Sequence, residues 1–307
     1  MSKKLVLPIP NKEDILKFTC DENHRSANDA DNKIRENILA NIKNIDDKFF
    51  SDPIYGEKWS KLISAFNNSM TQLQTQFDTF AIKYKAGRKN NYDFELAFFD
   101  ENKNKIKVVK LEFKFNASKV EDVPQFVSPM KPSQYLSIPF EDYFYDTYLV
   151  SLLGEFNLQI PNRENYLKTI HTNGPICVKD AQLLYYQGCQ RSSKYSGEEK
   201  AISFYAKANE YSKKGIMDFI NLADLDITKL SQYILCSQKE KIYLLYKNGI
   251  FNIEKSGENE NDFIIESCMK NPEKFRYEAV TKSKRKLNIL LRWKNGNGIA
   301  YPAFQIS

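Results

Sequence analysis

Apolar residues in the first eighty positions recur at helical spacing. Four isoleucines separated by three or four positions follow Asp31, which predicts an amphipathic helix with its start near that residue. Residues 57–78 carry a wider apolar stripe, which predicts a helix that faces the core. The first stripe consists of Ile34, Ile38, Ile42 and Ile45, and the second of Trp59, Leu62, Ile63, Phe66, Met70, Leu73 and Phe77.

The pattern then changes to the alternation that is typical of β-strands. A strand is predicted over 80–85, and two further runs, 92–99 and 106–115, flank a short polar stretch and predict a β-hairpin. Successive residues of a strand point to opposite faces of the sheet. Glu112 and Lys114 therefore share one face of the second hairpin strand. The opposite, apolar face consists of Val109, Leu111, Phe113 and Phe115.

The remainder of the chain combines helices with two further hairpins. The predicted helices cover 140–156, 180–187, 198–213 and 223–235. The residues Lys247-Asn248-Gly249 predict the turn of a hairpin over about 241–254, and a final hairpin is predicted over 287–306. The chain is therefore expected to close in β structure.

Three polar residues of the first hairpin are the candidate chemical groups. Asp93 lies on one strand, and Glu112 and Lys114 lie together on the next. Carboxylates are hard oxygen ligands that suit Mg²⁺, which completes its shell with water and substrate phosphate. A lysine beside them can position or deprotonate an attacking water and stabilise the transition state. The (D/E)xK triplet occurs four more times in polar helical or loop stretches, and only here lies in an apolar strand.

This arrangement resembles the catalytic core of the PD-(D/E)xK nuclease superfamily, and most of all a type II restriction endonuclease. The resemblance covers about residues 30–135 and departs from the family pattern because no proline precedes Asp93. It implies an α/β fold with a restriction-endonuclease-like core, in which helices flank a central mixed sheet. A helical and β-hairpin C-terminal extension would follow that core. It also implies that Asp93, Glu112 and Lys114 are catalytic, and that the two acids bind one or two Mg²⁺ ions.

Three further residues are auxiliary candidates. Glu36 matches a glutamate that many members carry on a helix before the core strands, and Gln125 matches a glutamine that follows the motif in several branches. Glu95 shares a strand face with Asp93 and is the next acid to test. Simpler interpretations stay open: a solvated Glu36, an ordinary Gln125, and a hairpin whose outer face carries only a cross-strand salt bridge.

Composition agrees with a polyanionic partner. The formal net charge of the 307 residues is +6. The five cysteines are scattered without a CxxC spacing, which argues against zinc or a disulfide framework and favours the reducing cytoplasm. No run of 18 apolar residues exists, so no membrane-spanning segment is expected. The cations that are candidates for DNA contact are Arg88, Lys89, Lys119, Arg191, Lys194, Arg285 and Arg292.

These features together predict a Mg²⁺-dependent endonuclease that cleaves double-stranded DNA at specific sequences. It is expected to act as a homodimer, with a DNA methyltransferase as its companion. The nuclease core is expected over 30–160, and a recognition and structural region over 161–307 is expected to pack on it as one compact unit. Two alternatives remain open. One is a viral or repair nuclease that acts on DNA structure or ends, and the other is a catalytically inactive nucleic-acid-binding protein.

Overall fold

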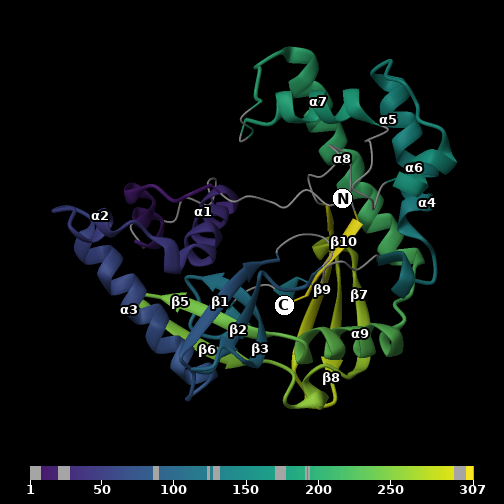
Figure 1. Cartoon of the computed structure of the whole chain (residues 1–307). Coiled ribbons are helices and arrows are strands. Elements are labelled where there is room, and N and C mark those ends of the chain that lie inside the picture. The colour runs from purple at the N-terminus through teal and green to yellow at the C-terminus, as the bar shows by residue number, and fades with distance from the viewer. Residues whose placement is uncertain are drawn as a thin grey trace. The chain divides into compact units, whose positions relative to one another are not determined.

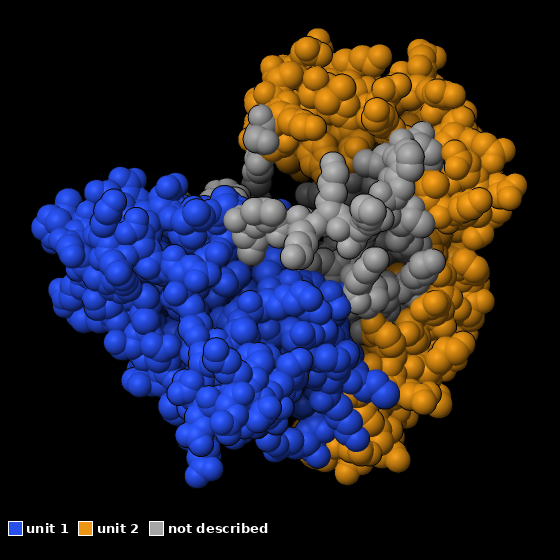
Figure 2. Space-filling view, viewed as in Figure 1, with its two compact units in different colours: residues 1–123, 236–258 blue, residues 124–235, 259–307 orange. Residues whose placement is uncertain are grey.

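The chain folds into two compact units. Unit 1 consists of residues 1–123 and 236–258, and unit 2 of residues 124–235 and 259–307 (Figure 2). The structure is a computed structural model. It describes residues 8–19, 28–85, 90–122, 125–126, 132–169, 178–190, 192, 194–293 and 302–306.

Unit 1 is built on a mixed five-stranded sheet (Figure 1). The strand order is β1-β2-β3-β5-β6, and all neighbours pair antiparallel except β3 and β5, which are parallel. The strands are β1 (Thr79–Tyr84), β2 (Phe94–Phe99), β3 (Lys105–Phe115), β5 (Ile242–Lys247) and β6 (Ile250–Lys255). The helices are η1 (Lys12–Phe18), α1 (Asn28–Ala40), η2 (Ile42–Asn44), α2 (Asp47–Phe50), α3 (Gly56–Leu73) and η3 (Val120–Asp122).

Helix α3 supplies the large side chains of the unit 1 core. Its predicted stripe is confirmed, because Trp59, Phe66 and Met70 are buried and belong to one cluster with the inner face of the sheet. The helix ends at Leu73, five residues before the predicted end, and the backbone at the next position is extended. Phe77 lies beyond the helix and still packs on a strand residue, Phe98, with ring centroids 4.9 Å apart.

The predicted first hairpin is confirmed in its position and in its two faces. Strands β2 and β3 pair with Phe94 opposite Leu111 and Leu96 opposite Val109. These four side chains are buried in the unit 1 core. The alternation of the sequence therefore places Glu112 on the face away from α3, where a second small cluster lies. That cluster consists of Ala117, Val120, Tyr243 and Leu245.

The second hairpin completes the same sheet. Its turn is confirmed at Asn248 and Gly249, which have φ angles of 51° and 83°, as a two-residue turn with left-handed central residues requires. The sequence pattern did not indicate that β5 would pair with β3. Their parallel alignment sets Glu112 beside Tyr243 and Lys114 beside Leu245.

Unit 2 combines helices with an antiparallel sheet of order β4-β10-β9-β8-β7. Its strands are β4 (Gln125–Phe126), β7 (Ile265–Asn271), β8 (Arg276–Thr281), β9 (Lys286–Trp293) and β10 (Pro302–Ile306). Its helices are η4 (Pro132–Tyr135), α4 (Phe140–Phe144), the π-helical η5 (Tyr145–Leu149), α5 (Val150–Glu155), α6 (Arg163–Thr169), α7 (Lys179–Gly188), α8 (Glu199–Leu222), η6 (Glu260–Asp262) and η7 (Pro272–Lys274). Helix α9 (Ile227–Lys239) begins in unit 2, and its residues from Cys236 onward belong to unit 1. Helix α8 continues nine residues beyond its predicted end because its buried stripe reaches Phe219 and Ile220.

The protein is thus an α/β protein with a mixed five-stranded sheet, helices and a second, antiparallel sheet. The two units divide the chain at places other than the predicted boundary between 160 and 161. Residues 236–258 belong to unit 1 because β5 and β6 extend its sheet, and residues 124–160 belong to unit 2. A chain that returns to an earlier sheet cannot be divided by one cut in the sequence.

Candidate active site

Asp93 and Glu112 meet across strands β2 and β3. Asp93 immediately precedes β2, and its backbone N–H donates to the carbonyl oxygen of Leu111 at 2.8 Å. Since Phe94 pairs with Leu111, the register sets Asp93 opposite Glu112. The Oδ2 atom of Asp93 accepts a hydrogen bond of 2.9 Å from the backbone N–H of Phe113. The hairpin register therefore brings together the two acids that the sequence predicted as metal ligands.

Glu112 lies between two ammonium groups. Its Oε1 atom is 2.6 Å from Nζ of Lys114, two residues along the same strand face. Its Oε2 atom is 3.2 Å from Nζ of Lys241. Only 8% of Glu112 is exposed. The carboxylate is therefore removed from water and bound at both oxygens by positive charge.

Lys241 is a member of this site that the sequence did not reveal. It immediately precedes β5, its side chain is 0% exposed, and its Nζ atom also donates to the carbonyl oxygen of Asn91 at 2.9 Å. It stands 129 positions after Glu112 in the chain. The only signal in the sequence is a lysine next to the apolar run Ile242 to Tyr246. Only the parallel pairing of β3 with β5 places it at the acids.

Glu36 joins the site from helix α1. It is half-buried, and its Oε2 atom accepts a hydrogen bond of 2.7 Å from the hydroxyl of Tyr84 on β1. Its charge acts on Asp93, and that of Glu112 acts on Glu36, so the three carboxylates lie near one another. Glu36 therefore lies with the predicted catalytic residues and not on a solvated helix face.

The electrostatics follow from an excess of carboxylates in a buried place. Burial, reinforced by the charges of Glu112 and Glu36, raises the pKa of Asp93 well above its ordinary value. Burial also opposes ionisation of Glu112, yet the two lysines hold its pKa below the ordinary value. The pKa of Lys114 is raised because its carboxylate neighbours outweigh its burial. Burial prevails at Lys241 and lowers its pKa. The cluster thus sets three carboxyl groups against two ammonium groups, which leaves more acidic than basic side chains.

The donor atoms suit a hard divalent cation. Carboxylate oxygens are the ligands that Mg²⁺ prefers, and Oδ1 of Asp93 accepts no hydrogen bond from a described residue. Within the described ranges, no three acidic, histidine or cysteine side chains are grouped closely enough to enclose an ion by themselves. The ammonium group of Lys114 stands at Oε1 of Glu112, where a cation would bind. Asp93 and Glu112 would hold the ion, with water and phosphate as its further ligands.

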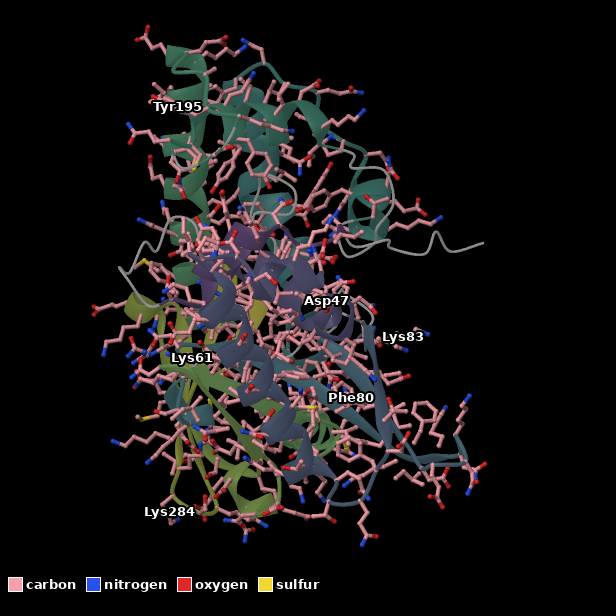
Figure 3. The ribbon with its side chains drawn as sticks, turned by 60° about the vertical axis from the view of Figure 1, so that its left-hand side comes forward. Asp47, Lys61, Phe80, Lys83, Tyr195 and Lys284 are labelled. Atoms are coloured by element: carbon pink, nitrogen blue, oxygen red, sulfur yellow. The ribbon has the colours of Figure 1, made fainter. Side chains whose placement is uncertain are left out.

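Glu95 does not join the cluster. It lies on the same strand face two residues beyond Asp93, and its Oε2 atom forms an ion pair of 3.1 Å with Lys85. It is opposite Lys110 on β3 and Lys83 on β1, and Figure 3 shows Lys83 extending outward from β1. Since its charge is paired with Lys85 outside the cluster, Glu95 is an unsuitable replacement for Asp93.

Gln125 and the candidate cations are distributed over both units. The backbone of Gln125 lies in β4 of unit 2, and Lys119 is an exposed residue of unit 1. In unit 2, Nζ of Lys194 is exposed and 5.9 Å from the ring centre of Tyr186. The guanidinium carbon of Arg285 is 5.4 Å from the ring centre of Phe263. Arg88, Lys89, Arg191 and the side chains of Gln125 and Arg292 lie outside the described residues.

Comparison of the chain with protein-family models, with curated proteins and with solved structures finds no match. Through the part of the chain that the structure describes, no helix combines the length and the apolar character needed to cross a membrane.

Proposed function

We propose that this protein is a metal-dependent nuclease of the PD-(D/E)xK type, with a restriction-endonuclease-like core in unit 1. The observation that carries the proposal is the meeting of Asp93, Glu112 and Lys114 with Glu36, in which Glu112 is buried and the other three side chains are partly buried. Burying charges is costly for folding, and clusters of ionisable groups with shifted pKa values are concentrated at functional sites. A cross-strand salt bridge on a solvated face would need neither the burial nor the third carboxylate.

Each group of the cluster has a part in phosphodiester hydrolysis under this proposal. Bound Mg²⁺ supplies charge to neutralise the phosphate in the transition state and lowers the pKa of a water ligand. Asp93 and Glu112 would hold the ion. Lys114 releases Glu112, positions the attacking water and stabilises charge on the phosphate. The hydrogen bond from Phe113 keeps Asp93 in place, and Tyr84 does the same for Glu36.

The substrate in this proposal is double-stranded DNA, cleaved at specific sequences as by a type II restriction endonuclease. Unit 2 would take part in recognition, and the exposed Lys119 and Lys194 would contact phosphates. A homodimer would supply one site for each strand of a symmetric sequence. A companion DNA methyltransferase in the same cytoplasm would protect the host DNA.

Incubation of the protein with plasmid and phage DNA in Mg²⁺ tests the proposal. We expect discrete fragments from the wild type, and no cleavage from Asp93→Asn or Glu112→Gln. Glu95→Gln is the matched control because it changes a carboxylate on the same face that pairs with Lys85 outside the cluster. It should cleave as the wild type does.

Each other outcome has a defined meaning. A smear of products, or cleavage only at ends and junctions, would replace sequence specificity by recognition of DNA structure. Binding without any cleavage would make the protein an inactive nucleic-acid-binding protein. Cleavage by Asp93→Asn at the wild-type rate would show that the activity does not come from this cluster.

A further inference from the structure

Asp93 and Glu112, the two candidate metal ligands, each have one carboxylate oxygen that accepts a hydrogen bond from another residue of unit 1. The Oδ2 atom of Asp93 accepts from the backbone N–H of Phe113 at 2.9 Å. The Oε2 atom of Glu112 accepts from Nζ of Lys241 at 3.2 Å. A backbone amide cannot leave its carboxylate without a change in the strand. Oδ1 of Asp93, which accepts no hydrogen bond from a described residue, is therefore the oxygen most open to a ligand.

Lys241 is held nearly as firmly as a backbone group. Its side chain is 0% exposed, and its ammonium group also donates to the carbonyl oxygen of Asn91 at 2.9 Å. The ring centre of Tyr243 is 5.2 Å from the same atom. If Lys241 left Glu112, a buried charge would lose its counter-charge, which is strongly unfavourable. Lys114 differs, because 15% of its side chain is exposed and it lies on the oxygen that a ligand would use.

Internal donors and charge in the cluster favour one ion over two. Centres with two divalent ions hold them about 3.5–4 Å apart, so the carboxylates around them must offset the charge of both ions. Asp93, Glu112 and Glu36 each have one oxygen that already accepts a hydrogen bond from within unit 1, and the donor at Glu112 is the charged Lys241. A positive charge is also already present beside Glu112, where a second ion would have to bind.

We propose that Lys241 acts as a resident cation in place of a second metal ion, so that the cluster binds a single divalent ion between Asp93 and Glu112. This proposal rests on the nuclease function and adds its metal stoichiometry. Lys241 is then a positioning residue. It holds Glu112 in the orientation in which Oε1 is available and lowers the affinity of the site for further positive charge.

A purely structural salt bridge makes the opposite prediction for metal affinity. If Lys241 only kept Glu112 in place, removal of its charge would disorder the carboxylate and weaken metal binding. If Lys241 competes with metal for the negative charge of the cluster, removal of its charge strengthens binding. Glutamine suits this comparison because its amide can still donate hydrogen bonds, while the positive charge is removed.

The experiment is a titration with Mn²⁺ in the absence of DNA, followed by the paramagnetic resonance signal of the free ion. We expect the wild type to bind one Mn²⁺ per chain and Asp93→Asn to bind none. Lys241→Gln should still bind one ion, with an affinity about tenfold higher or more, because a neighbouring positive charge has been removed. Lys247→Gln is the matched control. It makes the same change at the exposed last residue of β5, about 20 Å from Lys241 at about 3.3 Å per residue, and should bind as the wild type does.

Two Mn²⁺ ions bound per wild-type chain would overturn the proposal without use of any variant. Unchanged or weaker binding by Lys241→Gln would overturn it as well and leave Lys241 a structural residue. Circular dichroism shows whether Lys241→Gln folds. If it does not, the proposal is tested by the number of Mn²⁺ ions that the wild type binds and by Lys241→Arg, which keeps the charge and should bind Mn²⁺ with the wild-type number and affinity. Failure of the nuclease function itself is distinct, because the wild type would then bind no more Mn²⁺ than Asp93→Asn.

Discussion

Replacement of Asp93 by asparagine is expected to stabilise the metal-free protein at neutral pH. Asp93 is opposite Glu112, and directly opposite residues of antiparallel strands have Cβ atoms about 4.5–5.5 Å apart. Two like charges about 5 Å apart repel by about 3 kcal/mol at an effective dielectric constant of about 20. Asparagine has nearly the same shape, removes this repulsion and can keep its oxygen at the N–H of Phe113.

The gain in free energy of unfolding is smaller than the repulsion alone. The carboxylate also attracts the ammonium group of Lys114, and its hydrogen bond from Phe113 is charge-assisted, which is worth about 1.5–3 kcal/mol. A net gain of about 1–2 kcal/mol in the absence of metal is therefore expected. Replacement of a functional residue commonly stabilises a protein while it reduces activity, because the residue was retained for function and not for stability.

The pH dependence of this gain has a definite sign. The pKa of Asp93 is raised in the folded state by burial and by neighbouring carboxylates, so the folded protein binds the proton more tightly than the unfolded chain. The wild type thus loses stability as the pH rises from the unfolded value, about 3.9, through the folded pKa. The advantage of Asp93→Asn should be absent below about pH 4 and complete above the folded pKa.

Urea unfolding in EDTA at several pH values measures this effect. Trp59 is fully buried in unit 1, and the other tryptophan, Trp293, lies in β9 of unit 2. In a Trp293→Phe background, fluorescence therefore reports unit 1 alone. Glu95→Gln is again the control and should change stability by less than about 1 kcal/mol.

Excess Mn²⁺ should reverse the order of the two proteins. A ligand at one hundred times its dissociation constant stabilises the protein that binds it by about 2.7 kcal/mol. The wild type should gain this stability and Asp93→Asn should not. The reasoning is refuted if Asp93→Asn is the less stable protein in EDTA at pH 7.5, because Asp93 would then make attractive interactions that outweigh its repulsion.

Two further predictions separate catalysis from DNA binding. Lys114→Met should reduce single-turnover cleavage in Mg²⁺ by about 10²–10⁴-fold and change affinity little in a gel shift with Ca²⁺. Cleavage at the normal rate would remove Lys114 from the mechanism. Arg285→Ala should weaken binding and reduce the slope of log affinity against log salt by about one for each phosphate group that the side chain neutralises. The control is Lys284→Ala, at a residue of the same turn that is labelled in Figure 3 and forms an ion pair of 2.5 Å with Glu266. An equal effect of both changes would indicate general charge and not a specific interaction.

Local patterns in the sequence determined much of unit 1. The apolar stripe of α3 and the alternation in β2 and β3 depend only on residues a few positions apart, and each was confirmed. The turn at Asn248 and Gly249 was equally predictable, because few residues accept left-handed backbone angles. The same local rules placed Glu112 and Lys114 on one strand face and Asp93 on the strand beside it. The core of the candidate site was therefore available from the sequence.

Long-range pairing decided the rest. Local periodicity does not encode which strand a distant strand will join, so the return of β5 to β3, the division into units and the arrival of Lys241 at Glu112 were not predictable. Burial also had to be observed, since Asp93 and Glu95 are equivalent in the alternation of β2. Packing gave Glu95 a lysine partner and left Asp93 among carboxylates. The sequence by itself determined which side chains share a face, and the tertiary structure alone decided which charges are buried together.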